Sequence, residues 1–206
     1  MDKQNDVILV GMQHVQTHSP LATHGFAHPR RNVGVLGVEP GMSVADFGSG
    51  SGAYVLAIAE RLEGAGHVYA IDVQRDLLQR IKNEAHRRGF KNVEVIWADL
   101  ERPGASKIVD RHLDFVLISN LLFQVENKVA VLVEAERILR PNGRLAIIDW
   151  SDPALSNESQ RRVGPHRDHV ISKSSVVELA ESAGFELQRE FPAGAHHYGL
   201  VFKLLS

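Results

Sequence analysis

The sequence contains no cysteine. A disulfide framework, a zinc site built on thiolates and catalysis by a thiol are therefore excluded. The chain also lacks an apolar run of the ~18–20 residues that cross a bilayer, and its first residues lack the basic flank and long apolar segment of a secretory signal. These absences predict a cytoplasmic protein that does not insert into a membrane.

An excess of charge of either sign is missing as well. The 206 residues include 23 Lys and Arg against 25 Asp and Glu, which gives a formal net charge of −2. A chain with this balance has no general attraction to nucleic acid, so its composition argues against a nucleic-acid partner. Hydrophobic residues make up 44% of the chain, and its length fits one globular domain.

The chain does contain a regular alternation of short apolar runs and amphipathic segments. The expected strands are residues 43–47, 67–71, 93–97, 115–119 and 145–149. The expected helices are residues 30–38, 53–62, 76–88 and 128–139. Strands and helices that alternate at this spacing form parallel βαβ units. We therefore predict an α/β fold with a doubly wound, mostly parallel sheet and helices on both faces.

The C-terminal part departs from this alternation. A helix capped by Ser172 or Ser175 is followed by two strands, residues 185–191 and 197–204. The Pro-Ala-Gly connection that begins at Pro192 is so short that the two strands must pair antiparallel, as a hairpin at the edge of the sheet. We expect residues 31–206 to form one domain and residues 1–30 to form an N-terminal arm that covers it.

A glycine-rich loop separates the first expected strand from the next helix. Its sequence is Asp46-Phe47-Gly48-Ser49-Gly50-Ser51-Gly52-Ala53. Glycines at this point allow the backbone to approach a ligand closely, and the N–H groups that open the following helix favour an anionic group. Gly48-x-Gly50-x-x-Ala53 also fits the dinucleotide fingerprint, so a nicotinamide-dependent oxidoreductase is one alternative.

Polar side chains stand at the carboxyl ends of the expected strands, the edge where open α/β sheets bind ligands. Asp72 ends the second strand, where a carboxylate accepts both hydroxyls of a ribose. Asp99 follows the third strand, where it can accept a hydrogen bond from an adenine amino group, and Asn120 follows the fourth. Asp46 precedes the first glycine of the loop, where a carboxylate suits a cationic amine better than a pyrophosphate.

With these residues the chain resembles the class I S-adenosylmethionine-dependent methyltransferases over roughly residues 25–206. The matching segments are residues 44–52, 68–73, 97–100, 114–121 and 138–149. The last of them is similar to the small-molecule subgroup around the ubiquinone and menaquinone biosynthesis methyltransferases. The resemblance implies S-adenosylmethionine as cofactor and a Rossmann-like, seven-stranded sheet of order 3-2-1-4-5-7-6 with strand 7 antiparallel.

The resemblance also implies which residues hold that cofactor. Asp46 and the glycine loop would hold its methionine portion, and Asp72 its ribose. Asp99 and Leu100 would hold the adenine, while Asn120 and Leu121 would flank the sulfonium. The full implied cofactor-binding set is Asp46, Phe47, Gly48, Ser49, Gly50, Gly52, Asp72, Val73, Asp99, Leu100, Asn120 and Leu121.

Methyl transfer from a sulfonium is an in-line displacement, so the protein mainly holds the nucleophile, the methyl carbon and the sulfur in line. A base is needed only if the acceptor is not already anionic or electron-rich, and a histidine that titrates near neutrality suits that role. The candidate catalytic residues are His197, His196, Asp149 and His169. Strand alternation predicts opposite directions for the first two side chains, and the aspartate can equally serve in capping or packing.

The identity of the methyl acceptor is left open by these motifs. The resemblance implies a small molecule and a protein that works as a monomer or homodimer. Arg161, Arg162 and Arg167 would suit an anionic acceptor, and a methyltransferase acting on RNA or protein is a second alternative. A non-catalytic cofactor-binding module is a third, because methyl transfer needs few recognisable catalytic side chains.

Histidine is abundant, with 11 in the chain. The pairs His14/His18 and His24/His28 have i,i+4 spacing, which on a helix would present two metal ligands on one face. The surrounding sequence is poorly helical, and no cysteine or tight carboxylate cluster completes a ligand set. We therefore expect no metal.

Overall fold

The computed structural model of the protein describes residues 27–151 and 164–205. Its strands are β1 (Ser43–Phe47), β2 (His67–Asp72), β3 (Val93–Trp97), β4 (Leu113–Ser119), β5 (Leu139–Trp150), β6 (Phe185–Gly194) and β7 (His197–Leu204). Its α-helices are α1 (Pro29–Leu36), α2 (Ala53–Arg61), α3 (Arg75–Arg87), α4 (Lys128–Ile138) and α5 (Lys173–Ser182), and a 3-10 turn spans Arg167–His169. Within the described ranges, no helix is long and apolar enough to cross a membrane.

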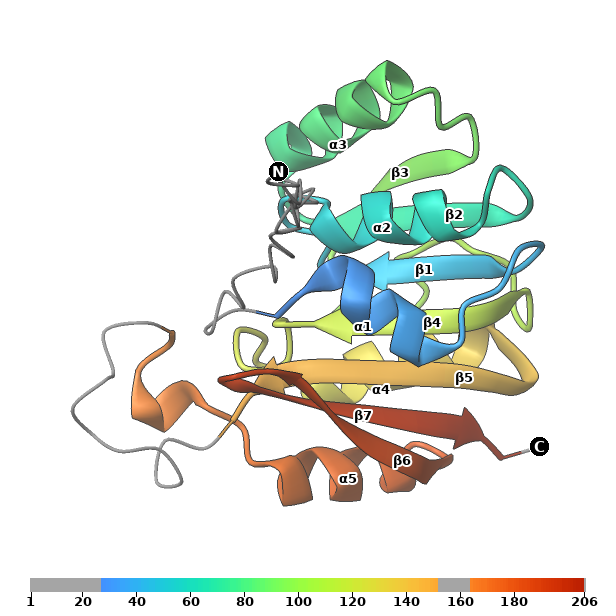
Figure 1. Cartoon of the computed structure of the whole chain (residues 1–206). Coiled ribbons are helices and arrows are strands. Elements are labelled where there is room, and N and C mark those ends of the chain that lie inside the picture. The colour runs from blue at the N-terminus through green and yellow to red at the C-terminus, as the bar shows by residue number, and fades with distance from the viewer. Residues whose placement is uncertain (1–26, 152–163, 206) are drawn as a thin grey trace, which may run out of the picture.

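The strands form one seven-stranded sheet of order β3-β2-β1-β4-β5-β7-β6. β1 to β5 pair in parallel, whereas β7 lies antiparallel between β5 and β6 (Figure 1). The predicted fold class, strand order and terminal hairpin are therefore confirmed. The order reverses between β1 and β4, the position at which doubly wound sheets bind their ligands.

Helices cover both faces of this sheet (Figure 1). α1 and α2 lie in front in this view, and residues of α1, α2 and α3 share one core with the sheet. α4 and α5 pack on the opposite face in a second core. The βαβ alternation thus leaves the carboxyl ends of β1, β2, β4 and β5 together at one edge, unobstructed by the helices that link them.

The pleat of β1 decides which of its side chains reach the α1/α2 face. Val44 belongs to the core on that face, whereas Ala45 and Phe47 belong to the core under α4 and α5. Because successive side chains point to opposite faces, Asp46 shares the α1/α2 face with Val44. In β4, Leu117 lies in the α1/α2 core, and Ser119 two residues later points the same way.

Most predicted boundaries differ from the structure by only one or two residues, and the largest differences are in β5 and β6. β5 starts at Leu139 instead of residue 145, because the chain is already extended and paired with Leu113 of β4 there. β6 continues through Pro192 to Gly194, since an irregular register keeps it paired with β7, and the turn of the hairpin is Ala195-His196. Of the two caps predicted for α5, the structure has Ser172, whose side chain accepts a hydrogen bond from the Ser175 N–H.

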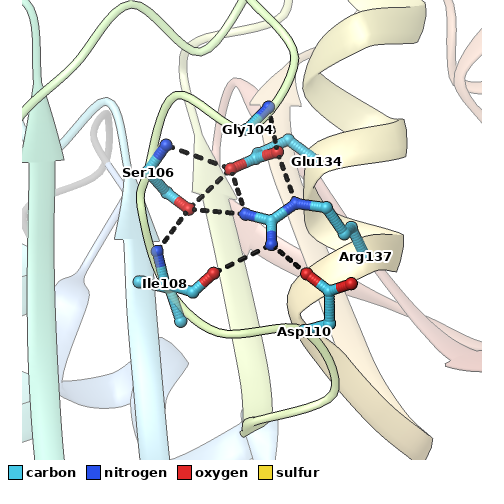
Figure 2. A network of polar contacts seen from close by, with 6 residues as sticks. All are labelled: Gly104, Ser106, Ile108, Asp110, Glu134 and Arg137. Atoms are coloured by element: carbon cyan, nitrogen blue, oxygen red, sulfur yellow. Dashed lines mark hydrogen bonds and ion pairs between the residues drawn. The ribbon is translucent and has the colours of Figure 1, made fainter.

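A buried ionic network, the Glu134 cluster (Gly104, Ser106, Ile108, Asp110, Glu134 and Arg137), fastens the segment before β4 to α4 (Figure 2). Glu134 is 2% exposed, accepts hydrogen bonds from Gly104 N–H and from both the N–H and the hydroxyl of Ser106, and pairs with Arg137 at 2.7 Å. Burial raises the pKa of this carboxyl, but the hydrogen bonds from Arg137 and Ser106 outweigh it and lower the pKa overall.

Candidate functional site

The glycine loop follows β1 directly and turns tightly against β2. The N–H groups of Gly48 and Ser49 both donate to the carbonyl of Ile71, at 2.9 and 3.0 Å. Gly48 has a φ of +71°, and a Cβ at this position would lie 2.9 Å from Cδ1 of Leu121. Only glycine combines this backbone conformation with such a close approach, so the loop can lie flat between β2 and the segment after β4.

Asp72 locks the loop to the end of β2. Its side chain is 7% exposed, and its two carboxylate oxygens accept hydrogen bonds from the N–H groups of Gly50 and Gln74, each at 2.8 Å. A carboxylate oxygen has more than one lone pair, so both oxygens retain capacity for hydroxyl donors of a ligand. The loop therefore presents a pre-oriented carboxylate at the switch point of the sheet.

A cavity of about 280 Å³, called here the Asp72 cavity, opens beside this carboxylate. Its lining residues are Gly48, Gly50, Asp72, Val73, Gln74, Ala98, Asp99, Leu100, Glu101, Leu121, Gln124 and Val125. The lining thus contains both apolar and acidic side chains. Asp99 accepts hydrogen bonds from Glu101 N–H and from Arg102 Nε, both at 3.1 Å, and these contacts fix its carboxylate at the rim.

A second cavity of about 300 Å³, the His197 cavity, lies on the other side of the loop. Its lining residues are Ala27, Pro29, Asp46, Gly48, Ser49, Gly50, Ser51, Ala53, Tyr54, Ser119, Asn120, Gln124, Trp150 and His197. Gly48, Gly50 and Gln124 line both cavities, so the two spaces adjoin across the glycine loop. One elongated ligand can therefore occupy the Asp72 cavity and reach into the His197 cavity.

Asp46 is the acidic group that faces the His197 cavity from β1. It is 2% exposed, and no residue in the described part of the chain gives its buried Oδ1 a hydrogen bond. Burial, and secondly the negative charge of Asp72, raises its pKa to about 8. A carboxylate in this position favours a positively charged ligand group and opposes a pyrophosphate. The residues present therefore fit a sulfonium compound with an amino group better than a dinucleotide.

Three further side chains expose unpaired polar atoms to the same cavity. Within the described residues, Ser119 Oγ, Asn120 Oδ1 and both ring nitrogens of His197 are buried and have no hydrogen-bond partner. Asn120 also has a φ of +53°, a left-handed conformation that L-residues rarely adopt. Buried polar atoms are normally paired, so this concentration of unpaired ones marks a place where a ligand completes the hydrogen bonding.

Tyr54, Ser119 and Gln124 line the His197 cavity and were not among the predicted site residues. The Tyr54 hydroxyl accepts a hydrogen bond from Asn32 Nδ2 at 2.9 Å, and the same nitrogen donates to the carbonyl of Ala193. Tyr54 is the second residue of the helix that follows the glycine loop, and this position could have identified it as a site residue from the sequence. The contact of Tyr54 with Asn32 of α1 could not be predicted from the spacing of residues in the sequence.

Most of the implied cofactor set does lie at the two cavities. The residues that line one or both are Asp46, Gly48, Ser49, Gly50, Asp72, Val73, Asp99, Leu100, Asn120 and Leu121. Phe47 is instead fully buried in the core under α4 and α5. Gly52 caps α2, where a Cβ would lie 2.5 Å from Ile81 Cγ1, so its small size serves the packing of α2 against α3.

The four candidate catalytic residues separate in space. His197 lines its cavity, whereas His196 lies in the β6–β7 turn and His169 is exposed on the 3-10 turn. Asp149 is 1% exposed and does not line the His197 cavity, because the pleat of β5 turns it away from the α1/α2 face. Its carboxylate accepts a hydrogen bond from Trp150 N–H at 2.8 Å, and burial raises its pKa to about 6.

Some predicted features fall outside the described residues. His14, His18 and His24 lie there, as do Arg161 and Arg162 and nearly all of the expected N-terminal arm. Among the residues that are described, no group of three His, Asp or Glu side chains is arranged to hold a metal ion.

Comparison with known proteins bears directly on this arrangement. The sequence profile of the family described as "Methyltransferase domain" matches residues 38–184. A demethylmenaquinone methyltransferase of Anoxybacillus flavithermus is 27% identical over 165 residues, which cover 76% of this chain and 66% of that protein. A ubiquinone/menaquinone biosynthesis C-methyltransferase of Shewanella oneidensis is 30% identical over 135 residues, 65% of this chain and 52% of that protein. The chain thus matches about half to two thirds of the length of these relatives.

Among solved structures, a SAM-dependent methyltransferase from Aquifex aeolicus superposes with a TM-score of 0.76 at 27% sequence identity. The match covers 87% of this chain and 90% of that one. The family match spans well over half of the sequence. The chain therefore belongs to the methyltransferase domain family, and its resemblance to the S-adenosylmethionine-dependent members is confirmed.

Proposed function

We propose that the protein transfers a methyl group from S-adenosylmethionine to a small-molecule acceptor by in-line displacement. The observation that carries the proposal is the pair of cavities that adjoin across the glycine loop, with the Asp72 carboxylate in one and the Asp46 carboxylate in the other. Relatives named for demethylmenaquinone and ubiquinone/menaquinone biosynthesis support an acceptor of small size.

The side chains of the Asp72 cavity and the His197 cavity suit different parts of the cofactor. Asp72 would accept the ribose hydroxyls, and Asp99 and Leu100 would hold the adenine in the Asp72 cavity. Asp46 would attract the positively charged methionine portion where it crosses the glycine loop. Asn120 and Leu121 would flank the sulfonium from the segment after β4.

The remainder of the His197 cavity would then receive the acceptor. The protein's contribution there is to exclude water and to hold the acceptor atom in line with the methyl carbon and sulfur, at near-attack distances of about 3–3.5 Å. Of the four candidate catalytic residues, His197 is the one we place against the acceptor. Asp149, His196 and His169 lie away from this space and are assigned no role in it.

Cofactor binding tests the proposal directly. Asp72→Ala removes the carboxylate that orients the loop and accepts the ribose, so we expect the affinity for S-adenosylhomocysteine to fall about 100-fold or more in calorimetry, the loss of two charge-assisted hydrogen bonds. Asp76→Ala, an exposed aspartate in the first turn of α3, is the matched control and keeps the wild-type affinity. Unchanged affinity of Asp72→Ala would contradict the proposal.

The acceptor class needs a separate measurement. A cell extract is incubated with methyl-labelled S-adenosylmethionine and the protein, and the label is followed into small-molecule, RNA and protein fractions. We expect label in the small-molecule fraction, whereas label in RNA or protein would favour the alternative acceptor. We further propose that the protein is a monomer or homodimer, which sedimentation would test. We propose that it works in the cytoplasm, which cell fractionation would test. We also propose that residues 1–30 cover the cavities, and truncation of residues 1–26 would test this.

A further inference from the structure

Asn32 and Tyr54 form a buried contact that joins α1 to α2 beside the His197 cavity. Asn32 is 2% exposed and Tyr54 8%. Asn32 Nδ2 donates one hydrogen bond to the Tyr54 hydroxyl oxygen and another to the carbonyl of Ala193 in β6, each at 2.9 Å. An amide nitrogen has only two hydrogens, so both are used and the Asn32 side chain is held in one orientation.

The hydrogen bond from Asn32 determines what the Tyr54 hydroxyl can do. Because its oxygen accepts from Asn32, the phenol must donate its own hydrogen elsewhere. Burial raises the pKa of Tyr54 above its ordinary value, so the hydroxyl keeps that hydrogen at neutral pH. Ser119 lies near the hydroxyl, but its Oγ makes no hydrogen bond of good geometry within residues 27–151 and 164–205. The Tyr54 hydrogen is therefore available to a ligand of the cavity that Tyr54 lines.

The His197 cavity offers an amino-acid ligand an acidic group but no basic one. Asp46 faces it from β1, and lies near enough to Tyr54 that its charge raises the pKa of the phenol. Among the described residues that line the cavity there is no Lys or Arg. Burial, and secondly the proximity of His196, lowers the pKa of His197 to about 4, so this ring is neutral near neutral pH. A carboxylate bound beside Asp46 therefore depends on uncharged donors.

The Tyr54 hydroxyl is well placed to be such a donor. Tyr54 is the second residue of α2, at the end of the helix whose unpaired N–H groups favour an anion. The Ser49 hydroxyl, by contrast, already donates to the carbonyl of Asp46 at 2.8 Å. An amino group and a carboxylate that share one carbon lie close together. A ligand whose amine pairs with Asp46 therefore brings its carboxylate near this end of α2.

We propose that Asn32 is a positioning residue that makes Tyr54 a hydrogen-bond donor to the carboxylate of the cofactor's methionine portion. The inference rests on the proposed function, because it adds two residues to the methionine end of the cofactor site. Asn32 does not line either cavity, so it acts through the phenol. Its second hydrogen bond, to Ala193, connects that phenol to the β6–β7 hairpin. α1 and the hairpin thereby help to select a cofactor that carries a carboxylate.

Two ligands that differ only in this carboxylate test the assignment without turnover. S-Adenosylhomocysteine carries it and decarboxylated S-adenosylhomocysteine lacks it, so the ratio of their affinities in calorimetry reports what the carboxylate contributes. In Tyr54→Phe we expect this ratio to fall about tenfold or more, the loss of one hydrogen bond to a charged group. Asn32→Leu has a similar size but no N–H to orient the phenol, so the ratio should fall about threefold or more.

A double variant separates positioning from general damage. If Asn32 acts through Tyr54, Asn32→Leu should have no further effect on the ratio once Tyr54→Phe is present. Asn32→Val removes the same donor with a smaller side chain, and it takes the place of Asn32→Leu if the latter does not fold. Tyr69→Phe in β2, which lines neither cavity, and Asn83→Leu, at an exposed position of α3, should retain the wild-type ratio.

An unchanged ratio in Tyr54→Phe or in Asn32→Leu would overturn the inference, and so would a larger fall in the double variant than in Tyr54→Phe alone. Binding of S-adenosylhomocysteine by the wild-type protein distinguishes these failures from failure of the proposed function. If the wild-type protein does not bind that compound, the proposed function is wrong and the inference is overturned with it. If it binds and Asn32→Leu keeps the wild-type ratio, the cofactor assignment stands and only the role of Asn32 is wrong.

Discussion

Two of the places where the molecule buries polar side chains are built in opposite ways. In the Glu134 cluster, every hydrogen-bonding direction of the Glu134 carboxylate is filled by the protein, and Arg137 neutralises its charge (Figure 2). Around the His197 cavity, Asp46, Ser119, Asn120 and His197 all have buried polar atoms that find no hydrogen-bond partner among residues 27–151 and 164–205. The two regions are similarly buried, but only the first is complete in the folded protein alone.

The pKa values of Glu134 and Asp46 shift in opposite directions as a result. Hydrogen bonds from Arg137 and Ser106 overcome the effect of burial and lower the pKa of Glu134, so this group is stable as a carboxylate. Asp46 has no such donor, and burial together with the charge of Asp72 raises its pKa to about 8. A buried acid that the fold has neutralised is structural, whereas one that lacks a cation is positioned for a cationic ligand.

A substitution that breaks the Glu134 cluster should produce the largest change in stability. Glu134→Gln removes the charge opposite Arg137 and one oxygen that accepts N–H groups, so we expect the free energy of unfolding to fall by about 2–3 kcal/mol, less than for a fully buried pair because Arg137 is partly exposed. Urea denaturation measures this. Glu136→Gln, an exposed residue on the same helix, should stay within about 0.5 kcal/mol.

The same variant also sharpens the comparison. Because the Glu134 cluster lies away from both cavities, Glu134→Gln should bind S-adenosylhomocysteine as the wild-type protein does at temperatures where it is folded. A loss of unfolding free energy below 0.5 kcal/mol, or a selective loss of binding, would show that the cluster is not the closed structural network described above.

Asp46→Asn should have a smaller effect, and one that depends on pH. The folded-state pKa of about 8 lies above the ordinary value of 3.8, so the stability that protonated Asp46 contributes is fully present below pH 3.8 and is lost as the pH rises through 8. Asparagine never ionises. We therefore expect the variant to be more stable than the wild-type protein by about 1–2 kcal/mol at pH 8.5, with the difference shrinking toward pH 4.

Urea denaturation from pH 4 to pH 8.5 measures that difference, and Asp76→Asn is the exposed control with no such trend. The gain should coincide with weaker binding of S-adenosylmethionine, because the variant lacks the negative charge assigned to its methionine portion. A pH-independent difference between variant and wild-type protein would mean that Asp46 is already ionised and paired in the folded state.

The fold and the residues proposed to bind the cofactor could be predicted from the sequence because both depend on local signals. Alternating strands and helices determine the parallel sheet, and the short link between β6 and β7 determines the antiparallel hairpin. Asp72 and Asp99 could be placed because each follows a strand whose carboxyl end is fixed by topology. Strand ends and glycine turns are therefore predictable from a few neighbouring residues.

The rest depends on contacts between distant segments. Asn32 reaches Tyr54 and Ala193 only because α1 packs beside the β6–β7 hairpin, and no spacing in the sequence records that contact. Asp149 shows a subtler limit, since a shift of one residue along β5 separates it from Trp150, which does line the cavity. The face of a strand end is set by the pleat and register of the whole sheet.

The smallest expected effect comes from a matched pair of serines, one in each region. The Ser106 hydroxyl donates to Glu134 at 2.5 Å and accepts from Ile108 N–H at 3.2 Å, so Ser106→Ala should lower the free energy of unfolding by about 1 kcal/mol. The Ser119 hydroxyl is buried near Tyr54 and makes no hydrogen bond of good geometry within the described residues, so Ser119→Ala should stay within about 0.5 kcal/mol of the wild-type protein. Equal losses in urea denaturation would mean that Ser119 is satisfied within the protein, and the His197 cavity would then be as closed as the Glu134 cluster.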